Sequence, residues 1–184
     1  TIWMDDGSPL KVYADRLQQS MQAAFDAEDE DVLVLNGMAY SEPFIHQAMQ
    51  ELEHKGISDI LVLPMFPQYS TATTASVFHG VQQAANKWKQ RPRLKFLDDL
   101  FSEPAFIRAW SILITKYLDE QNIDHVVFSY HGLPEQNIQK ADAAKVCQFG
   151  DCCQQINDKN RHCYRAQCVA TTQSIVQALG WEED

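Results

Sequence analysis

Four short apolar runs, separated by longer segments with helical periodicity, constrain the fold of this chain more than any other feature. Each run is long enough for one buried strand, and together they cover residues 32–35, 60–63, 94–97 and 125–130. Apolar residues recur at helical spacing in the segments around them, which are 9–25, 41–55, 71–88, 102–117 and 169–179. Strands and helices that alternate in this way are typical of βαβ units. We therefore predict an α/β fold with a parallel sheet flanked by helices.

The charge of the chain excludes some classes of partner. Its 184 residues carry a formal net charge of -10, which disfavours nucleic acid or an anionic lipid surface as the main partner. No apolar run approaches the roughly 18 residues of a membrane span, so we expect no transmembrane helix. Peripheral contact with a membrane stays open, and the sequence does not predict an oligomeric state.

The histidine at position 131 is the strongest single candidate for chemistry. It ends the apolar run at 125–130, and Gly132 and Pro134 follow at once, so the backbone turns there. Ligands of open α/β sheets bind at the carboxyl ends of strands, and an imidazole can take a proton or bind a metal near neutral pH. The alternative is a strand-end ring bonded to a backbone carbonyl. The position of His131 favours an active-site role.

A second candidate site is the loop after the run at 60–63. Pro64 and Pro67 bracket apolar Met65 and Phe66, and hydroxyl-bearing residues follow at 69–74. A flat, mostly apolar ligand with polar edges would suit such a loop. Capping of the next helix by threonine, with aromatic packing in the core, explains the same residues equally well.

The cysteines form one local cluster. A secreted disulfide scaffold would spread its cysteines, so the clustering indicates a metal site in a reducing compartment. Structural zinc sites usually space paired ligands about two to four residues apart, whereas C-x4-C spacing also occurs in plant-type [2Fe–2S] loops. Zinc and an iron–sulfur cluster both stay open as the bound metal. We expect one of the adjacent Cys152 and Cys153 to be spare, and His162 is an alternative ligand. The candidates are Cys147, Cys152, Cys153, Cys163 and Cys168.

With these segments assembled, the chain resembles the ferrochelatase family, whose members insert Fe²⁺ into protoporphyrin IX to make protohaem. Residues 129–134 (SYHGLP) match the family's (S/F)xHG(L/I)P segment. Residues 63–70 (LPMFPQYS) match its LPLYPQ(Y/F)S segment, with Phe66 in place of the usual tyrosine. Residues 2–10 and 37–40 match the segment before the first long helix and the GMxY turn. The matches follow the family's order across nearly the whole chain.

The resemblance implies a chelatase-like architecture of two Rossmann-like domains, with porphyrin in the cleft between them. Residues 1–101 would form most of the first domain, and residues 102–184 the start of the second. The family's first strand, with its NLGTP-like segment, has no counterpart here. Neither does its later glutamate, which works opposite the histidine. We therefore expect a fragment that does not insert metal alone.

The resemblance also implies roles for individual residues. His131 corresponds to the family's active-site histidine, which takes protons from the pyrrole nitrogens or holds the incoming iron. Protoporphyrin IX and Fe²⁺ would be the substrates. The residues expected to line the porphyrin cleft are Ser8, Pro9, Met65, Phe66, Gln68, Tyr69, Ser70 and Tyr130.

Some bacterial members of the family hold a [2Fe–2S] cluster through an internal cysteine-rich segment. Residues 147–168 follow the HGLP motif where other members have a short turn, which implies an inserted cluster loop with a structural or sensing role. The implied location is the cytoplasm, with peripheral attachment to the inner membrane left open. Two alternatives remain: a chelatase that inserts cobalt or nickel into another tetrapyrrole, and a non-enzymatic iron–sulfur or zinc-binding module.

Overall fold

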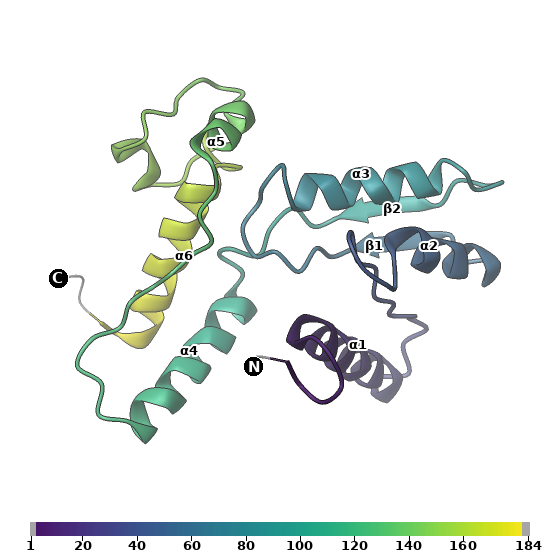
Figure 1. The fold of residues 1–184 in the computed structure, drawn as a ribbon, viewed down its shortest axis with the longest axis horizontal. Coiled ribbons are helices and arrows are strands. Elements are labelled where there is room, and N and C mark those ends of the chain that lie inside the picture. Colours follow the sequence, from purple (N-terminus) through teal and green to yellow (C-terminus); the bar gives the residue numbers. More distant parts are fainter. Residues whose placement is uncertain (1–2, 182–184) are drawn as a thin grey trace. The chain divides into compact units, whose positions relative to one another are not determined.

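The computed structural model describes residues 3–181, and the chain divides into two compact units (Figure 1). The first unit contains residues 3–60 and 79–93, and the second contains residues 61–78 and 94–181. The expected boundary between two Rossmann-like domains at residues 101 and 102 stays a prediction.

The sheet consists of two parallel strands, β1 (Asp59–Val62) and β2 (Arg93–Phe96). Arg93 N–H donates to the Ser58 carbonyl at 2.7 Å, and Leu97 N–H donates to the Val62 carbonyl at 3.0 Å. Every second residue of each strand is half-buried, as the two-residue period of a strand requires. The runs at 60–63 and 94–97 are therefore confirmed as strands, each beginning one position earlier than predicted.

Helix α3 (Thr74–Ala85) connects β1 to β2. Its Phe78 ring packs against Phe96 of β2, with the ring centroids 4.4 Å apart. The order β1–α3–β2 is a βαβ unit, and it confirms the predicted α/β class with a helix-flanked parallel sheet.

In the first unit, α1 (Pro9–Ala27) begins where the sequence predicts. Ser8 is the N-cap, and its Oγ accepts a hydrogen bond from Lys11 N–H at 3.3 Å. Pro9 occupies the first helical position, where its missing N–H costs no hydrogen bond. These three residues fix the start of the helix.

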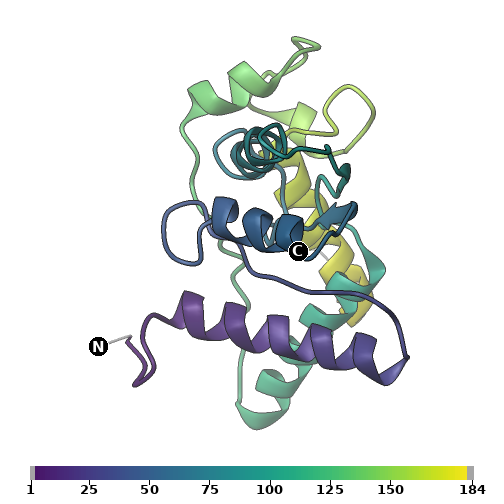
Figure 2. The same ribbon diagram turned by 90° about the vertical axis from the view of Figure 1, so that its right-hand side faces the viewer.

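The apolar run at 32–35 is not a strand, so this prediction was wrong. Figure 2 shows the segment after α1 returning along that helix. The Gln22 side chain makes two hydrogen bonds to the backbone of this segment. Its Nε2 donates to the Val32 carbonyl and its Oε1 accepts from Val34 N–H, each at 2.8 Å. Gln18 Nε2 donates to the Val34 carbonyl at 2.7 Å. Side-chain amides of α1 thus form hydrogen bonds with backbone groups of residues 32–34 that would pair with a neighbouring strand in a sheet.

Helix α2 (Ile45–His54) begins later than the Ser-Glu-Pro signal at 41–43 predicts. Phe44 N–H donates to Gln47 Oε1 at 2.7 Å, which satisfies a backbone donor at the start of the helix. Met49 and Leu52 are the buried residues of this helix, as its spacing predicts.

In the second unit, α4 (Pro104–Glu120) packs against α6 (Tyr164–Leu179). Ile107 of α4 is buried, but much of the apolar stripe of α4, including Trp110 and Tyr117, stays exposed. Helix α6 starts earlier than the predicted 169–179 segment. It ends as predicted at Gly180, whose φ of 68° is in the left-handed region.

Residues 125–130 also lack the predicted strand. Val126 is exposed and Val127 is 86% exposed, and within residues 3–181 only β1 and β2 are strands. A strand needs a neighbour for its backbone groups, and the described residues supply none here.

Two short elements that the sequence did not predict follow, α5 (Glu135–Ala141) and the 3₁₀ helix η1 (Asp151–Cys153). In the described part of the chain, no helix has the length and hydrophobicity to cross a membrane.

Candidate functional site

The loop after β1 turns its polar residues inward and its apolar residues outward. Gln68 and Ser70 are buried, whereas Met65 and Phe66 are 57% and 41% exposed. Ser70 Oγ accepts a hydrogen bond from Ala72 N–H at 3.1 Å, so this hydroxyl stabilises the turn before α3. The loop therefore offers an apolar outer surface on a hydrogen-bonded interior.

Helix α6 holds the central part of this loop. Tyr69 N–H donates to Gln167 Oε1 at 2.6 Å. Gln68 Nε2 donates to Thr171 Oγ1 at 3.0 Å. Both side chains of α6 are buried, so water does not compete for these bonds.

The same helix also holds the turn that carries His131. Tyr130 Oη and Thr172 Oγ1 are hydrogen-bonded at 2.8 Å, and Tyr164 Oη donates to the His131 carbonyl at 2.9 Å. Burial raises the pKa of Tyr130, and it raises the pKa of Tyr164 to about 12, so both phenols keep their protons at neutral pH. The His131 side chain is exposed, and within residues 3–181 its ring has no hydrogen-bond partner. The ring is thus exposed for contact with a ligand.

A small groove lies beside Tyr69. The Tyr69 ring packs against the His162 ring with centroids 4.7 Å apart, and His162 Nε2 lies 3.4 Å from Asp98 Oδ2. The groove has a volume of about 10 Å³. Pockets for small organic ligands measure roughly 300–1,000 Å³. The groove beside Tyr69 is therefore too small to enclose a tetrapyrrole.

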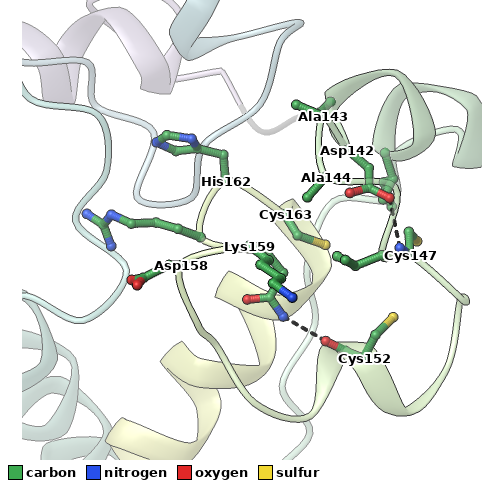
Figure 3. Close-up of a pocket in the computed structure, with 14 residues that line it drawn as sticks. Asp142, Ala143, Ala144, Cys147, Cys152, Asp158, Lys159, His162 and Cys163 are labelled. Carbon is green, nitrogen blue, oxygen red and sulfur yellow. Dashed lines mark hydrogen bonds between the residues drawn. The ribbon is translucent and has the colours of Figure 1, made fainter.

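The cysteine segment surrounds a larger cavity of about 370 Å³. Cys147, Cys152 and Cys163 line it from separate parts of the segment (Figure 3). Cys153 is buried, with its sulfur 3.9 Å from that of Cys152. Cys168 is buried on α6 and does not line the cavity. All five cysteines are free thiols.

The thiols differ in acidity. Backbone N–H groups of Gln148 and Gly150 lower the pKa of Cys152 to about 7. Burial raises the pKa of Cys153 to about 12 and that of Cys168 to about 11. Cys152 is therefore the thiol with the largest thiolate fraction among these three at neutral pH.

The side chains of the segment do not form a metal site as they stand. Within residues 3–181, no group of three or more histidine, cysteine, aspartate or glutamate side chains is placed to hold one. The donor chemistry suits a soft metal, since several thiols share one cavity, but their present positions form no closed coordination site.

Comparison with known proteins connects these features to a family. The ferrochelatase family profile matches residues 2–184. This chain belongs to the ferrochelatase family. A ferrochelatase of Coxiella burnetii (strain CbuG_Q212) is 38% identical over 97% of this chain and 49% of its own length. Ferrochelatases of Bdellovibrio bacteriovorus (36%, 52% of its length) and Legionella pneumophila strain Corby (35%, 51% of its length) match the same share of this chain. The chain thus spans about half the length of the curated ferrochelatases it matches.

The residues predicted from the ferrochelatase resemblance fall into both units. The second unit contains seven of them, which the structure joins to α6 directly or through the same loop: Met65, Phe66, Gln68, Tyr69, Ser70, Tyr130 and His131. Ser8 and Pro9 belong to the first unit, where they begin α1. Their roles in ligand binding stay predictions.

The sequence did not indicate the residues of α6 that hold the ferrochelatase motifs. These residues lie within or directly after the cysteine-rich segment, where the cysteines are the more prominent feature of the sequence. They are Tyr164, Gln167, Thr171 and Thr172. A weak signal did exist, because a run of polar residues interrupts the apolar face of a helix that the structure buries.

Proposed function

We propose that this chain is part of an enzyme that inserts ferrous iron into protoporphyrin IX and so forms protohaem. The observation that carries the proposal is the attachment of two family motifs to one helix. The loop at 63–70 and the turn at 129–134 both bond to α6, although about sixty residues separate them in sequence. Family membership over residues 2–184 supports the same activity.

In this proposal His131 does the proton chemistry. Iron insertion releases the protons of the pyrrole nitrogens as the metal takes their place. A neutral imidazole accepts such a proton at one ring nitrogen, and an exposed ring can pass it to water. Tyr164 orients the residue by donating to its carbonyl while leaving the ring free.

The loop at 63–70 supplies the apolar contact in this proposal. Met65 and Phe66 present exposed side chains that suit the face of a macrocycle, and contact at a distance from the centre can help to bend it. Gln68 bonds to Thr171 of α6 and Ser70 accepts a bond within the loop, so both residues shape the loop, whereas Tyr69 lines the groove beside it.

Titration of protoporphyrin IX into this chain tests the binding part. We expect a shift of the Soret band, and we expect Phe66→Ala to weaken binding. Leu61→Ala is the matched control, because Leu61 is also an exposed apolar residue but lies on β1. An unchanged Soret band would instead indicate a module in which only the cysteines matter.

Replacement of His131 tests the chemical part. In a full-length protein that contains this chain, we expect His131→Ala to lower the rate of iron insertion by at least about a hundredfold, the usual size of general acid–base catalysis. His125→Ala is the control, because His125 is a nearby exposed histidine. Equal rates for the two variants would contradict the role of His131, and assays with Co²⁺ and Ni²⁺ would reveal a different metal substrate.

We also propose that the cysteine segment holds a [2Fe–2S] cluster, with zinc as the alternative. The sharing of one cavity by three thiols and the low pKa of Cys152 support this, although the thiols must move closer to coordinate a metal. Such a group would cross-link the segment. A coloured protein with acid-labile sulfide is expected, and a colourless protein with zinc would overturn the cluster. Free thiols also support a cytoplasmic location.

A further inference from the structure

One face of α6 is polar along its first half, and this face meets both ferrochelatase motifs. Three of its polar residues, Tyr164, Gln167 and Thr171, lie at helical spacings of three and four, so they project from the same side, and Thr172 follows Thr171 directly. Gln167 is 0% exposed and Thr171 is 3% exposed. Polar side chains are rarely buried so deeply unless hydrogen bonds satisfy them.

Gln167 uses both ends of its side-chain amide. Oε1 accepts from Tyr69 N–H at 2.6 Å. Nε2 donates to the Arg161 carbonyl at 2.6 Å and to Asp99 Oδ2 at 3.2 Å. A single buried amide thus joins the loop after β1, the segment after β2 and the residues that precede α6.

Thr171 makes a second connection one turn further along. Its Oγ1 accepts from Gln68 Nε2 at 3.0 Å. The hydroxyl proton lies within reach of the Phe101 and Gln167 carbonyls, each at 2.9 Å, and donates to one of them at a time. Gln68 and Tyr69 are therefore held by adjacent turns of one helix.

We infer that Gln167 and Thr171 are positioning residues for the tetrapyrrole loop: they fix the Gln68–Tyr69 step relative to the His131 turn, which α6 holds through Tyr164 and Thr172. The inference rests on the proposed function, because it assumes that this loop binds the tetrapyrrole. Neither residue touches the ligand. Each acts through the backbone or side chain of the loop.

The physical reason is the cost of an unpaired buried group. Without Gln167, Tyr69 N–H and Asp99 lose a buried partner, and the loop must move to find water. A loop that spends less time in its binding geometry lowers the apparent affinity by the same fraction. Loss of either residue should therefore weaken tetrapyrrole binding without any lost contact to the ligand.

The test compares isosteric and conservative variants in the 184-residue chain. We expect Thr171→Val, which removes only the hydroxyl, to weaken protoporphyrin IX binding about fivefold to tenfold, the equivalent of one buried hydrogen bond. Thr171→Ser keeps the hydroxyl and should bind within about twofold of the unmodified chain. Gln167→Met should weaken binding by at least as much as Thr171→Val.

Two controls separate positioning from general stability. Gln173→Met makes the same substitution on α6 at a residue whose side-chain amide makes only a long bond to the Gln154 carbonyl, at 3.5 Å, and this variant should bind protoporphyrin normally. Ile175→Ala removes a buried apolar side chain of α6 that has no polar role, so it lowers the free energy of unfolding without touching the loop. Its protoporphyrin affinity should stay unchanged once the folded fraction is taken into account.

Hydrogen exchange supplies a readout that does not depend on the ligand. The Tyr69 amide should exchange faster in Gln167→Met and at the normal rate in Gln173→Met, because only the first variant removes its acceptor. Equal protoporphyrin affinity in all variants, or an equal loss in Ile175→Ala, would overturn the positioning role alone. Absence of a Soret response in the unmodified chain would overturn the proposed function, and the positioning role with it.

Discussion

Two buried threonines of the second unit differ in what their hydroxyls do. Thr74 is 0% exposed, and its hydroxyl has no hydrogen-bond partner in the described residues. Thr171 is equally well buried, and its hydroxyl both accepts and donates. The stabilising effect of a buried hydroxyl depends on whether it is paired, because an unpaired one loses its bonds to water and gains nothing in return.

The same substitution at these two positions should therefore have opposite effects. We expect Thr74→Val to leave the free energy of unfolding unchanged or to raise it by up to about 1 kcal/mol. Thr171→Val should lower it by about 1–3 kcal/mol, since it leaves Gln68 Nε2 unpaired. Urea unfolding of both variants at one pH measures the difference. An equal loss of stability in both would contradict the unpaired state of Thr74.

Asp99 makes stability depend on pH. Burial raises the pKa of this carboxyl, and the nearby Asp98 raises it further, while Arg161, His162 and Gln167 lower it. Because the folded pKa lies above the unfolded value of about 3.8, the folded chain binds the proton more tightly than the unfolded chain. The contribution of Asp99 to stability is therefore largest at low pH and declines as pH rises from about 3.8 through the folded pKa.

Asp99→Asn tests this sign while keeping an oxygen acceptor for Gln167 Nε2. The free energy of unfolding of the original chain, minus that of the variant, should fall as pH rises through this window and then level off. Urea titrations at several pH values from about 4 to 7 measure it, and taking the difference cancels the other titrating groups. A difference that grows with pH would contradict the raised pKa.

At the scale of elements, the sequence predicts helices better than strands. Caps and prolines near Ser8 and Pro104 mark helix starts locally, and Gly180 marks a helix end. Strands depend on a partner that local pattern does not reveal. The runs at 60–63 and 94–97 pair with each other as strands, whereas those at 32–35 and 125–130 have no strand neighbour in the described residues.

The candidate site shows the same division. The motifs around Tyr69 and His131 are recognisable in the sequence because their turns require particular residues. The helix that joins them is not, because Gln167 and Thr171 act through spacing on α6 and through contacts distant in sequence.

The bonds from α1 to residues 32–34 give a prediction for this element. Gln22→Met removes both bonds to the Val32 and Val34 backbone. We expect the Val34 amide to exchange about fivefold faster, since it loses its acceptor on Gln22 and one net hydrogen bond is worth about 1 kcal/mol. Gln19→Met is the control, because Gln19 lies on the same helix and is exposed. Equal exchange rates at Val34 in the two variants would show that the glutamine does not hold the segment.

At the scale of the whole molecule, the proposed porphyrin-binding residues are divided between the two units. Hydrogen exchange with and without protoporphyrin IX would identify the segments that the ligand covers. The Leu10 amide at the start of α1 suits this experiment, because a helix N-terminus has no internal acceptor for it and it exchanges fast unless something covers it. We expect the ligand to slow exchange at residues 7–10, 65–70 and 130–133 together.

The start of α4 provides the control for that experiment. Pro104 follows its cap as Pro9 does in α1, so Ala105 N–H, like Leu10 N–H, has no acceptor within its own helix, but no ligand contact is proposed for α4. Exchange at residues 105 and 106 should therefore not respond to protoporphyrin. Protection at 65–70 and 130–133 without protection at 7–10 would remove Ser8 and Pro9 from the proposed site. It would leave the tetrapyrrole bound by the second unit alone, along the surface that α6 organises.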